Sequence, residues 1–194
     1  MSNPGSAHMA YFFFDFKDET KQDARALLVS LLTQLGNQSD ALCEILHNLH
    51  STHQSDSLQP HETALTNCLG DMAKISKDIP IYLIVDALDE CPNMSGITSP
   101  RDEVLNLVQG LVGMNLPNLR LCVTSRHGEF DIWRSLGPLT TPSTRISLHD
   151  EHGQNRDIEK YINAVVYSNA YAVGWKDEDK RTVVETLSNK ADGM

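Results

Sequence analysis

The chain has 194 residues, of which 26 are acidic and 16 basic, so its formal net charge is −10. Hydrophobic residues make up 40% of the chain and charged residues 22%, a composition typical of globular proteins that excludes a wholly disordered chain. The sequence contains no cluster of lysine and arginine and no apolar stretch long enough to cross a bilayer. We therefore expect neither a nucleic-acid partner nor a membrane partner.

The start of the chain has neither the basic region nor the apolar region of a signal peptide. Residues 5–9 resemble the remnant of a purification tag, so residues 1–9 are interpreted as a cloning scar. The four cysteines show no paired spacing, which favours reduced thiols over disulfides. Together these features predict a cytoplasmic protein.

The first half of the chain predicts one strand followed by three helices. Aromatic residues predict the strand, and leucines at helical spacing predict the first helix, with Thr20 or Asp23 as its N-cap. The expected elements are a strand at 10–16, helices at 24–36, 40–49 and 60–75, and a polar loop at 51–59.

The second half alternates strands with helices. The expected elements are strands at 79–86, 119–124 and 144–148, a helix at 104–111, and two final helices with residues 158, 161, 162 and 165 and residues 183, 184 and 187 facing inward. The strands at 79–86 and 119–124 are apolar on both alternations, which predicts burial on both faces of a parallel sheet. Strands that alternate with helices predict an α/β fold with a mostly parallel sheet.

The segment that follows the predicted strand at 79–86 carries the strongest functional signal. A run of apolar residues ends in Asp86, and Asp89 and Glu90 follow. Ligands of parallel α/β sheets bind beyond the carboxyl ends of the strands, and a carboxylate there can anchor a Mg²⁺ ion that bridges nucleotide phosphates. Asp86 has that position, and Glu90 would orient or deprotonate an attacking water. The simpler alternative is that these acidic residues merely end a strand and begin a loop. An apolar run followed by the sequence Asp-Ala-Leu-Asp-Glu is a more specific pattern than an acidic strand end, so the metal-binding interpretation is favoured.

A second strand end supports the same hypothesis. Thr124, Ser125 and Arg126 follow the predicted strand at 119–124. The guanidinium of Arg126 is a planar donor fork that matches phosphate oxygens. If the two strands are neighbours, we expect Asp86 and Arg126 to face one crevice.

These two segments resemble the NACHT class of STAND P-loop NTPases, and in particular large fungal NACHT proteins with a nephrocystin-like N-terminal domain. The resemblance is carried by residues 84–90 and 123–126, and it extends over 9–16, the leucine-rich helix after them and 191–194. It implies that Asp86 holds Mg²⁺ and that Glu90 or Asp89 polarises water. It also implies that Arg126 senses the nucleotide, with Ser125 and Thr124 beside it. The family usually has proline after that arginine, where this chain has His127.

The phosphate-binding loop of this class is missing from the sequence. None of the eleven glycines is followed by lysine, so there is no Walker A motif. In the family, that motif lies just before the aromatic strand, and its strand lies between those expected here at 119–124 and 144–148. We therefore expect residues 10–150 to form an incomplete P-loop NTPase-like parallel sheet sandwiched by helices, and residues 151–194 to begin a helical subdomain.

The resulting functional hypothesis is that the chain forms part of the nucleotide-binding switch domain of a NACHT signalling NTPase. The complete family domain would use Mg²⁺ with ATP or GTP, whereas we expect this chain to bind neither and to hydrolyse nothing alone. The first alternative is a non-enzymatic protein-interaction scaffold derived from that fold. A metal-dependent hydrolase that uses Asp86 and Glu90 without nucleotide is a third hypothesis. Protein partners or self-association are expected, because an incomplete sheet exposes an apolar edge.

Overall fold

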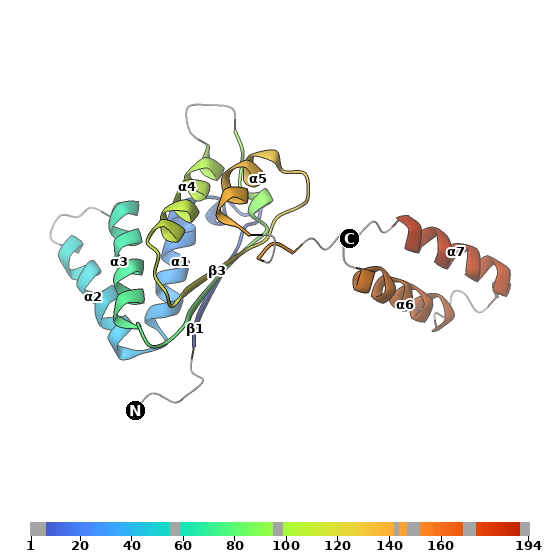
Figure 1. Cartoon of the computed structure of the whole chain (residues 1–194), viewed down its shortest axis with the longest axis horizontal. Helices are drawn as coiled ribbons and strands as arrows, with labels where there is room; N and C mark the ends of the chain where they lie inside the picture. Colours follow the sequence, from blue (N-terminus) through green and yellow to red (C-terminus); the bar gives the residue numbers. More distant parts are fainter. Residues whose placement is uncertain are drawn as a thin grey trace. The chain divides into compact units, whose positions relative to one another are not determined.

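The computed structural model describes residues 7–54, 59–94, 99–141, 144–146, 152–168 and 174–190. The chain divides into two compact units, Met1–Thr140 and Thr141–Met194 (Figure 1). The first unit contains the sheet and most of the helices, and the second contains two helices. Across the described ranges, no helix combines the length and the hydrophobicity that are needed to cross a membrane.

The sheet of the first unit has three parallel strands. They are β1 (His8–Phe13), β2 (Ile81–Asp86) and β3 (Leu119–Val123), in the spatial order β1-β2-β3. The register pairs Phe13 with Asp86 and Val85 with Val123, so the carboxyl ends of the strands lie together. The α/β class and the parallel sheet are confirmed. β1 includes His8 and Met9, which the sequence analysis assigned to a cloning scar.

Among the described residues, this unit has five α-helices, with three between β1 and β2, one between β2 and β3 and one after β3: α1 (Ala24–Gly36), α2 (Asp40–Gln54), α3 (Glu62–Ile75), α4 (Pro100–Gly113) and α5 (Phe130–Leu136). The side chain of Asp23 accepts a hydrogen bond from the backbone N–H of Ala26 at 2.7 Å, so Asp23 caps α1. α4 begins with Pro100 and a capping box between Ser99 and Asp102. α2 extends to Gln54, so the loop expected at 51–59 begins later than the sequence predicted.

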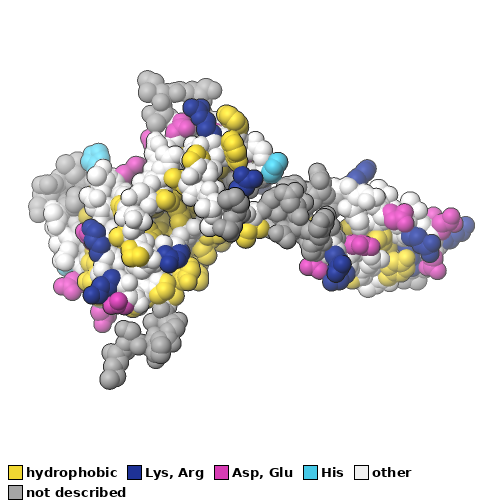
Figure 2. Space-filling model, viewed as in Figure 1, with side chains coloured by type: hydrophobic (Ala, Val, Ile, Leu, Met, Phe, Trp, Pro, Cys, Tyr) yellow, Lys and Arg dark blue, Asp and Glu magenta, His cyan; other side chains and the backbone are white. Residues whose placement is uncertain are grey.

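The core lies between the sheet and the helices on one of its faces (Figure 1). Ala10 and Leu83 point into this core and are buried, as are the leucines of α1. The opposite face, here called the exposed sheet face, is formed by side chains that are 42–51% exposed, namely Met9, Tyr11, Phe13 and Tyr82. Figure 2 shows hydrophobic side chains along the strand side of this unit. The prediction that the strands are buried on both faces is wrong, because both crossovers place their helices on the same face.

The fourth strand predicted at 144–148 is not formed at its described residues. Thr144 lies in a turn, Arg145 and Ile146 are irregular, and the last two positions lie outside the described residues. The backbone N–H of Thr144 donates to the carbonyl of Thr141 at 3.0 Å, and the N–H of Thr141 donates to the Thr144 hydroxyl at 2.8 Å. Hydroxyl side chains that bind nearby backbone favour a turn over a strand.

The second unit is a pair of helices, α6 (His152–Ser168) and α7 (Asp177–Lys190). Val166 and Val184 are its buried apolar residues among those described. Tyr161, Val165 and Leu187 were expected to face inward but are 71%, 39% and 48% exposed. Two helices share only one narrow contact stripe, and this leaves the neighbouring apolar positions uncovered.

Candidate functional site

The acidic loop, defined here as Ala87–Cys91, begins with a sharp change of backbone direction. Ala87 has φ 54° and ψ 45°, in the left-handed region that non-glycine residues rarely adopt. A short 3-10 helix, η2 (Leu88–Glu90), follows, and its first residue is fully buried. The loop is therefore anchored in the core at Leu88, and it presents Asp89 and Glu90 at the carboxyl end of β2. Backbone strain of this kind recurs at ligand sites.

Thr124 joins the ends of β2 and β3. Its N–H donates to the carbonyl of Val85 at 2.9 Å, and its carbonyl accepts from the N–H of Leu88 at 3.0 Å. Its hydroxyl accepts from the N–H of Ala87 at 3.0 Å and donates to the carboxylate of Asp86. Because a single residue makes these four contacts, the carboxylate of Asp86 is held at a defined position beside the acidic loop.

Arg126 lies against the acidic loop. Its backbone N–H donates to Asp89 Oδ1 at 2.9 Å, and its Nε lies 3.1 Å from Asp89 Oδ2. Its Nη2 lies 3.9 Å from Glu90 Oε1. The side chain of Asp89 is only 7% exposed and that of Glu90 is 24% exposed, whereas the guanidinium side chain is 74% exposed. Asp86, Asp89, Glu90 and Arg126 thus converge at one end of the sheet, and Ser125 lies exposed beside them.

The donor set at this end of the sheet is small. Asp86 provides one carboxylate on a rigid strand, and Thr124 provides a hydroxyl next to it. Among the described residues, no group of three or more histidine, cysteine, aspartate or glutamate side chains is arranged to hold a metal ion. Mg²⁺ commonly takes one or two protein carboxylates and completes its shell with water and substrate phosphates. The residues therefore fit a Mg²⁺ ion carried by a phosphorylated ligand.

Arg101 is a buried residue near the site that the sequence analysis did not single out. It lies in the first turn of α4 and contacts the carbonyl of Cys91 and the side chain of Glu129. The positive end of a helix dipole disfavours a cation at this position. The sequence did contain a signal for this residue. Ser99 and Pro100 predict a helix start, and an arginine directly after them is a cation at the disfavoured end of the helix.

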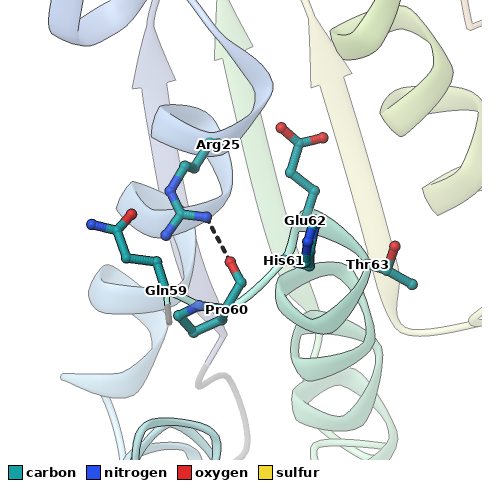
Figure 3. Close-up of a pocket in the computed structure, with 6 residues that line it drawn as sticks. All are labelled: Arg25, Gln59, Pro60, His61, Glu62 and Thr63. Carbon is teal, nitrogen blue, oxygen red and sulfur yellow. Dashed lines mark hydrogen bonds between the residues drawn. The ribbon is translucent and has the colours of Figure 1, made fainter. Parts of the chain in front are cut away.

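An open pocket lies apart from this site, between the start of α1 and the start of α3 (Figure 3). It has a volume of about 330 Å³, and none of the residues predicted to form the functional site lines it. Arg25 at its wall donates to the carbonyl of Pro60 at 2.6 Å, so this guanidinium is already engaged. The pocket therefore adds no group to the acidic site.

A family model described as Nephrocystin 3, N-terminal, matches residues 2–126. The chain belongs to this family. The matched range contains all three strands, the acidic loop and Arg126, so every residue proposed for the site lies in the nephrocystin 3 N-terminal region. No curated protein and no solved structure matches the chain.

Proposed function

We propose that residues 8–140 form the magnesium-binding and sensor half of the nucleotide-binding switch domain of a NACHT-type STAND signalling NTPase, of the kind found in fungi. The observation that carries this proposal is the convergence of four charged side chains at the ends of two neighbouring parallel strands, namely Asp86, Asp89, Glu90 and Arg126. Membership of the nephrocystin 3 N-terminal family supports it. In this proposal the chain works in the cytoplasm and hydrolyses neither ATP nor GTP alone.

The site residues have separate roles in this proposal. Asp86, oriented by the Thr124 hydroxyl, would hold a Mg²⁺ ion, which would supply positive charge to the phosphates of a bound nucleotide. Both oxygens of Asp89 bind Arg126. Glu90 Oε2 accepts from the N–H of Phe16 at 3.3 Å, and its Oε1 lies 3.9 Å from Arg126, so Glu90 Oε1 is the carboxylate oxygen that would polarise the attacking water. Arg126, whose guanidinium is largely exposed, turns from the acidic pair to the terminal phosphate, with Ser125 beside it.

The phosphate-binding half would come from a strand and a helix outside the described sheet. The connections β1–β2 and β2–β3 run in the same direction along the sheet, and their helices cover the same face. Parallel crossovers are right-handed. A strand placed beyond β3 and connected back to β1 would run in the opposite direction, so its helix would cover the exposed sheet face. One strand–helix unit would thus satisfy both the outer edge of β3 and the exposed face.

A turnover assay tests this proposal at its chemical step. The purified chain is expected to show no ATP or GTP hydrolysis above background, because the phosphate-binding loop supplies most of the grip on phosphate and of the charge stabilisation. Addition or fusion of a Walker A strand–helix segment from a nephrocystin-type protein is expected to produce Mg²⁺-dependent turnover. In that complemented protein, Glu90→Gln should abolish turnover. Nucleotide turnover by the unmodified chain would contradict the proposal. Turnover that persists in the complemented protein with Glu90→Gln would also contradict it.

The exposed sheet face favours a second candidate, a non-enzymatic interaction scaffold. Four large apolar side chains cover this face, and such patches commonly mark protein contacts. Here a protein partner or a second copy of the chain would cover Tyr11 and Tyr82, and the acidic loop would have only a structural role. The two candidates differ in Asp86→Asn, which removes nucleotide binding by the complemented protein but leaves protein association unchanged.

A further inference from the structure

The side chain of Arg101 joins two segments that are far apart in the sequence. It is 8% exposed, and its Nε donates to the carbonyl of Cys91 at 2.9 Å. One terminal nitrogen donates to the carbonyl of Asp89, and the other lies 2.7 Å from Glu129 Oε2 and 3.3 Å from Asp131 Oδ2. One guanidinium thus holds the backbone of the acidic loop on one side and the start of α5 on the other.

This arrangement is costly unless all of its partners are present. A buried cation at the positive end of a helix is disfavoured both by desolvation and by the helix dipole. Two carboxylates and two carbonyls compensate for this cost in the fold. Arginine fits the position because its donors point in several fixed directions, whereas a lysine ammonium is a point charge. Glu129 and Asp131 are 37% and 30% exposed, so the α5 side of this cluster reaches the surface.

We propose that Arg101 is a positioning residue that couples the start of α5 to the acidic loop and so determines where the carboxylates of Asp89 and Glu90 lie. A change at Glu129, near the surface, is transmitted through the guanidinium to the loop backbone. The meaning of this coupling for catalysis rests on the proposed nucleotide site, whereas the coupling itself is a property of the unliganded chain.

Cys91, at the end of the acidic loop, is a natural reporter of the coupling. Its side chain is fully buried, and its thiol donates to the carbonyl of Gln22 at 3.2 Å. Burial raises the pKa of Cys91 to about 12, although the nearby charge of Arg101 lowers it. If Arg101 loses its charge and the loop does not move, the pKa of Cys91 rises further. The thiolate is then rarer, and Cys91 reacts more slowly with an alkylating reagent. Faster alkylation after a change at Arg101 therefore reports that the loop has opened.

The experiment measures N-ethylmaleimide alkylation of each cysteine by mass spectrometry in the full chain. Arg101→Gln is expected to speed modification of Cys91 at least tenfold and to leave Cys68, a buried thiol on α3, unchanged. Asp131 also accepts from the side-chain amide of Asn93 at 3.1 Å, which is a second link to the segment beside Cys91. The variant Glu129→Gln leaves that link, the loop and Arg101 intact, and it should also speed the alkylation of Cys91 several-fold. Arg101→Lys should not restore the wild-type rate.

Two controls separate positioning from general stability. Arg120→Gln removes an exposed arginine of the same unit and should change neither buried thiol. A parallel rise at Cys68 and Cys91 in the Arg101 variants would show that Arg101 acts only through global stability and would overturn the proposal. An unchanged rate of Cys91 alkylation in Glu129→Gln would overturn it as well, even if Arg101→Gln does not fold.

The thiol assay needs no nucleotide, so its outcome is independent of the proposed function. If the alkylation results hold while the complemented chain binds no nucleotide, the coupling stands and the proposed function fails. If nucleotide binds while Cys91 stays protected in every variant, the proposed function stands and the coupling fails.

Discussion

The two edges of the sheet differ in what lies against them. At the outer edge of β1, two side-chain amides take the place of a neighbouring strand, those of Gln34 on α1 and of Gln38 just beyond its C-cap. Gln38 accepts from the N–H of Met9 at 2.9 Å and donates to its carbonyl at 2.5 Å. Gln34 accepts from the N–H of Tyr11 at 3.1 Å and donates to its carbonyl at 2.7 Å. Each amide thus satisfies one donor and one acceptor of the edge, as a strand would.

The outer edge of β3 has no such cover within the described part of the chain, where β3 pairs with β2 alone. The carbonyl of Asn118 accepts from Ile81 at 2.8 Å and the N–H of Thr124 donates to Val85 at 2.9 Å, so the even-numbered residues of this segment bond to β2. By the alternation of a parallel ladder, Leu121 and Val123 direct their backbone groups outward. Within the described residues, side chains of the same chain thus close one edge, and the other edge has no cover and can accept an added strand.

The largest expected effect separates the two sides of β3. Cys122→Pro removes a backbone donor directed at β2 and should lower the free energy of unfolding by at least about 3 kcal/mol. Val123→Pro removes a donor directed at the open edge, and its expected cost is about 1–2 kcal/mol, from lost packing of a half-buried side chain. Urea unfolding measures both values. Equal losses would mean that the outer edge of β3 is already paired.

A smaller loss is expected at the β1 edge. Replacing Gln34 and Gln38 together by alanine removes their four hydrogen bonds to the β1 edge and should lower the free energy of unfolding by about 2 kcal/mol, because net contributions at exposed positions are modest. Thr33→Ala, at an exposed position of the same helix, is the control and should change stability little. If the double variant is as stable as the control, the amides do not act as a substitute strand.

The exposed sheet face should drive weak self-association. We expect the average mass measured by light scattering to rise with protein concentration. Tyr82→Lys places a charge on this face and should raise the dissociation constant at least tenfold, about 1.4 kcal/mol. Ile75→Lys is a matched control, since Ile75 is 56% exposed at the end of α3. An average mass of the wild-type chain that does not change on dilution would show that neither this face nor the outer edge of β3 causes self-association.

The smallest effect is expected from the thiols on the covered side of the sheet. Burial raises the pKa of Cys68 from 9.0 to about 11 and that of Cys91 to about 12. The unfolded thiols ionise first, so their contribution to stability is complete below pH 9 and is lost as the pH rises towards 11 and 12. The midpoint of urea unfolding should therefore decrease above pH 9, and this decrease should be smaller in Cys68→Ala. Identical pH profiles would exclude such a contribution.

Local patterns in the sequence predicted most of what defines the site. Apolar runs predicted β2 and β3 to within two residues, and the polar residues after them predicted which side chains converge. The Gln34 and Gln38 contacts could not be predicted, because polar residues on a helix or just after it usually face solvent. The pairing of Arg101 with Glu129 and Asp131 joins positions 28 and 30 residues apart, for which one sequence has no signal. The roles of Asp86, Asp89, Glu90, Thr124, Ser125 and Arg126 in nucleotide binding stay predictions.

The apolar pattern was also the source of the main errors. Side chains such as Tyr11 and Tyr82 fit a strand that is buried on both faces, but which face is covered depends on the direction of the crossovers and not on the strand itself. The same limitation applies to the strand expected at 144–148, where contacts between Thr141 and Thr144 favour a turn. Both errors concern the region where the phosphate-binding half is proposed to lie.

Amide hydrogen exchange at the two sheet edges tests the central claim most directly, namely that β3 has an open edge which receives the phosphate-binding strand. In the unmodified chain, the account predicts slow exchange at Met9 and Tyr11, whose N–H groups bind glutamine amides, and fast exchange at Leu121 and Val123. After addition of the Walker A strand–helix segment, Leu121 and Val123 should become at least tenfold slower while Met9 and Tyr11 do not change. Slow exchange at Leu121 and Val123 before the addition, or no slowing after it, would contradict the account.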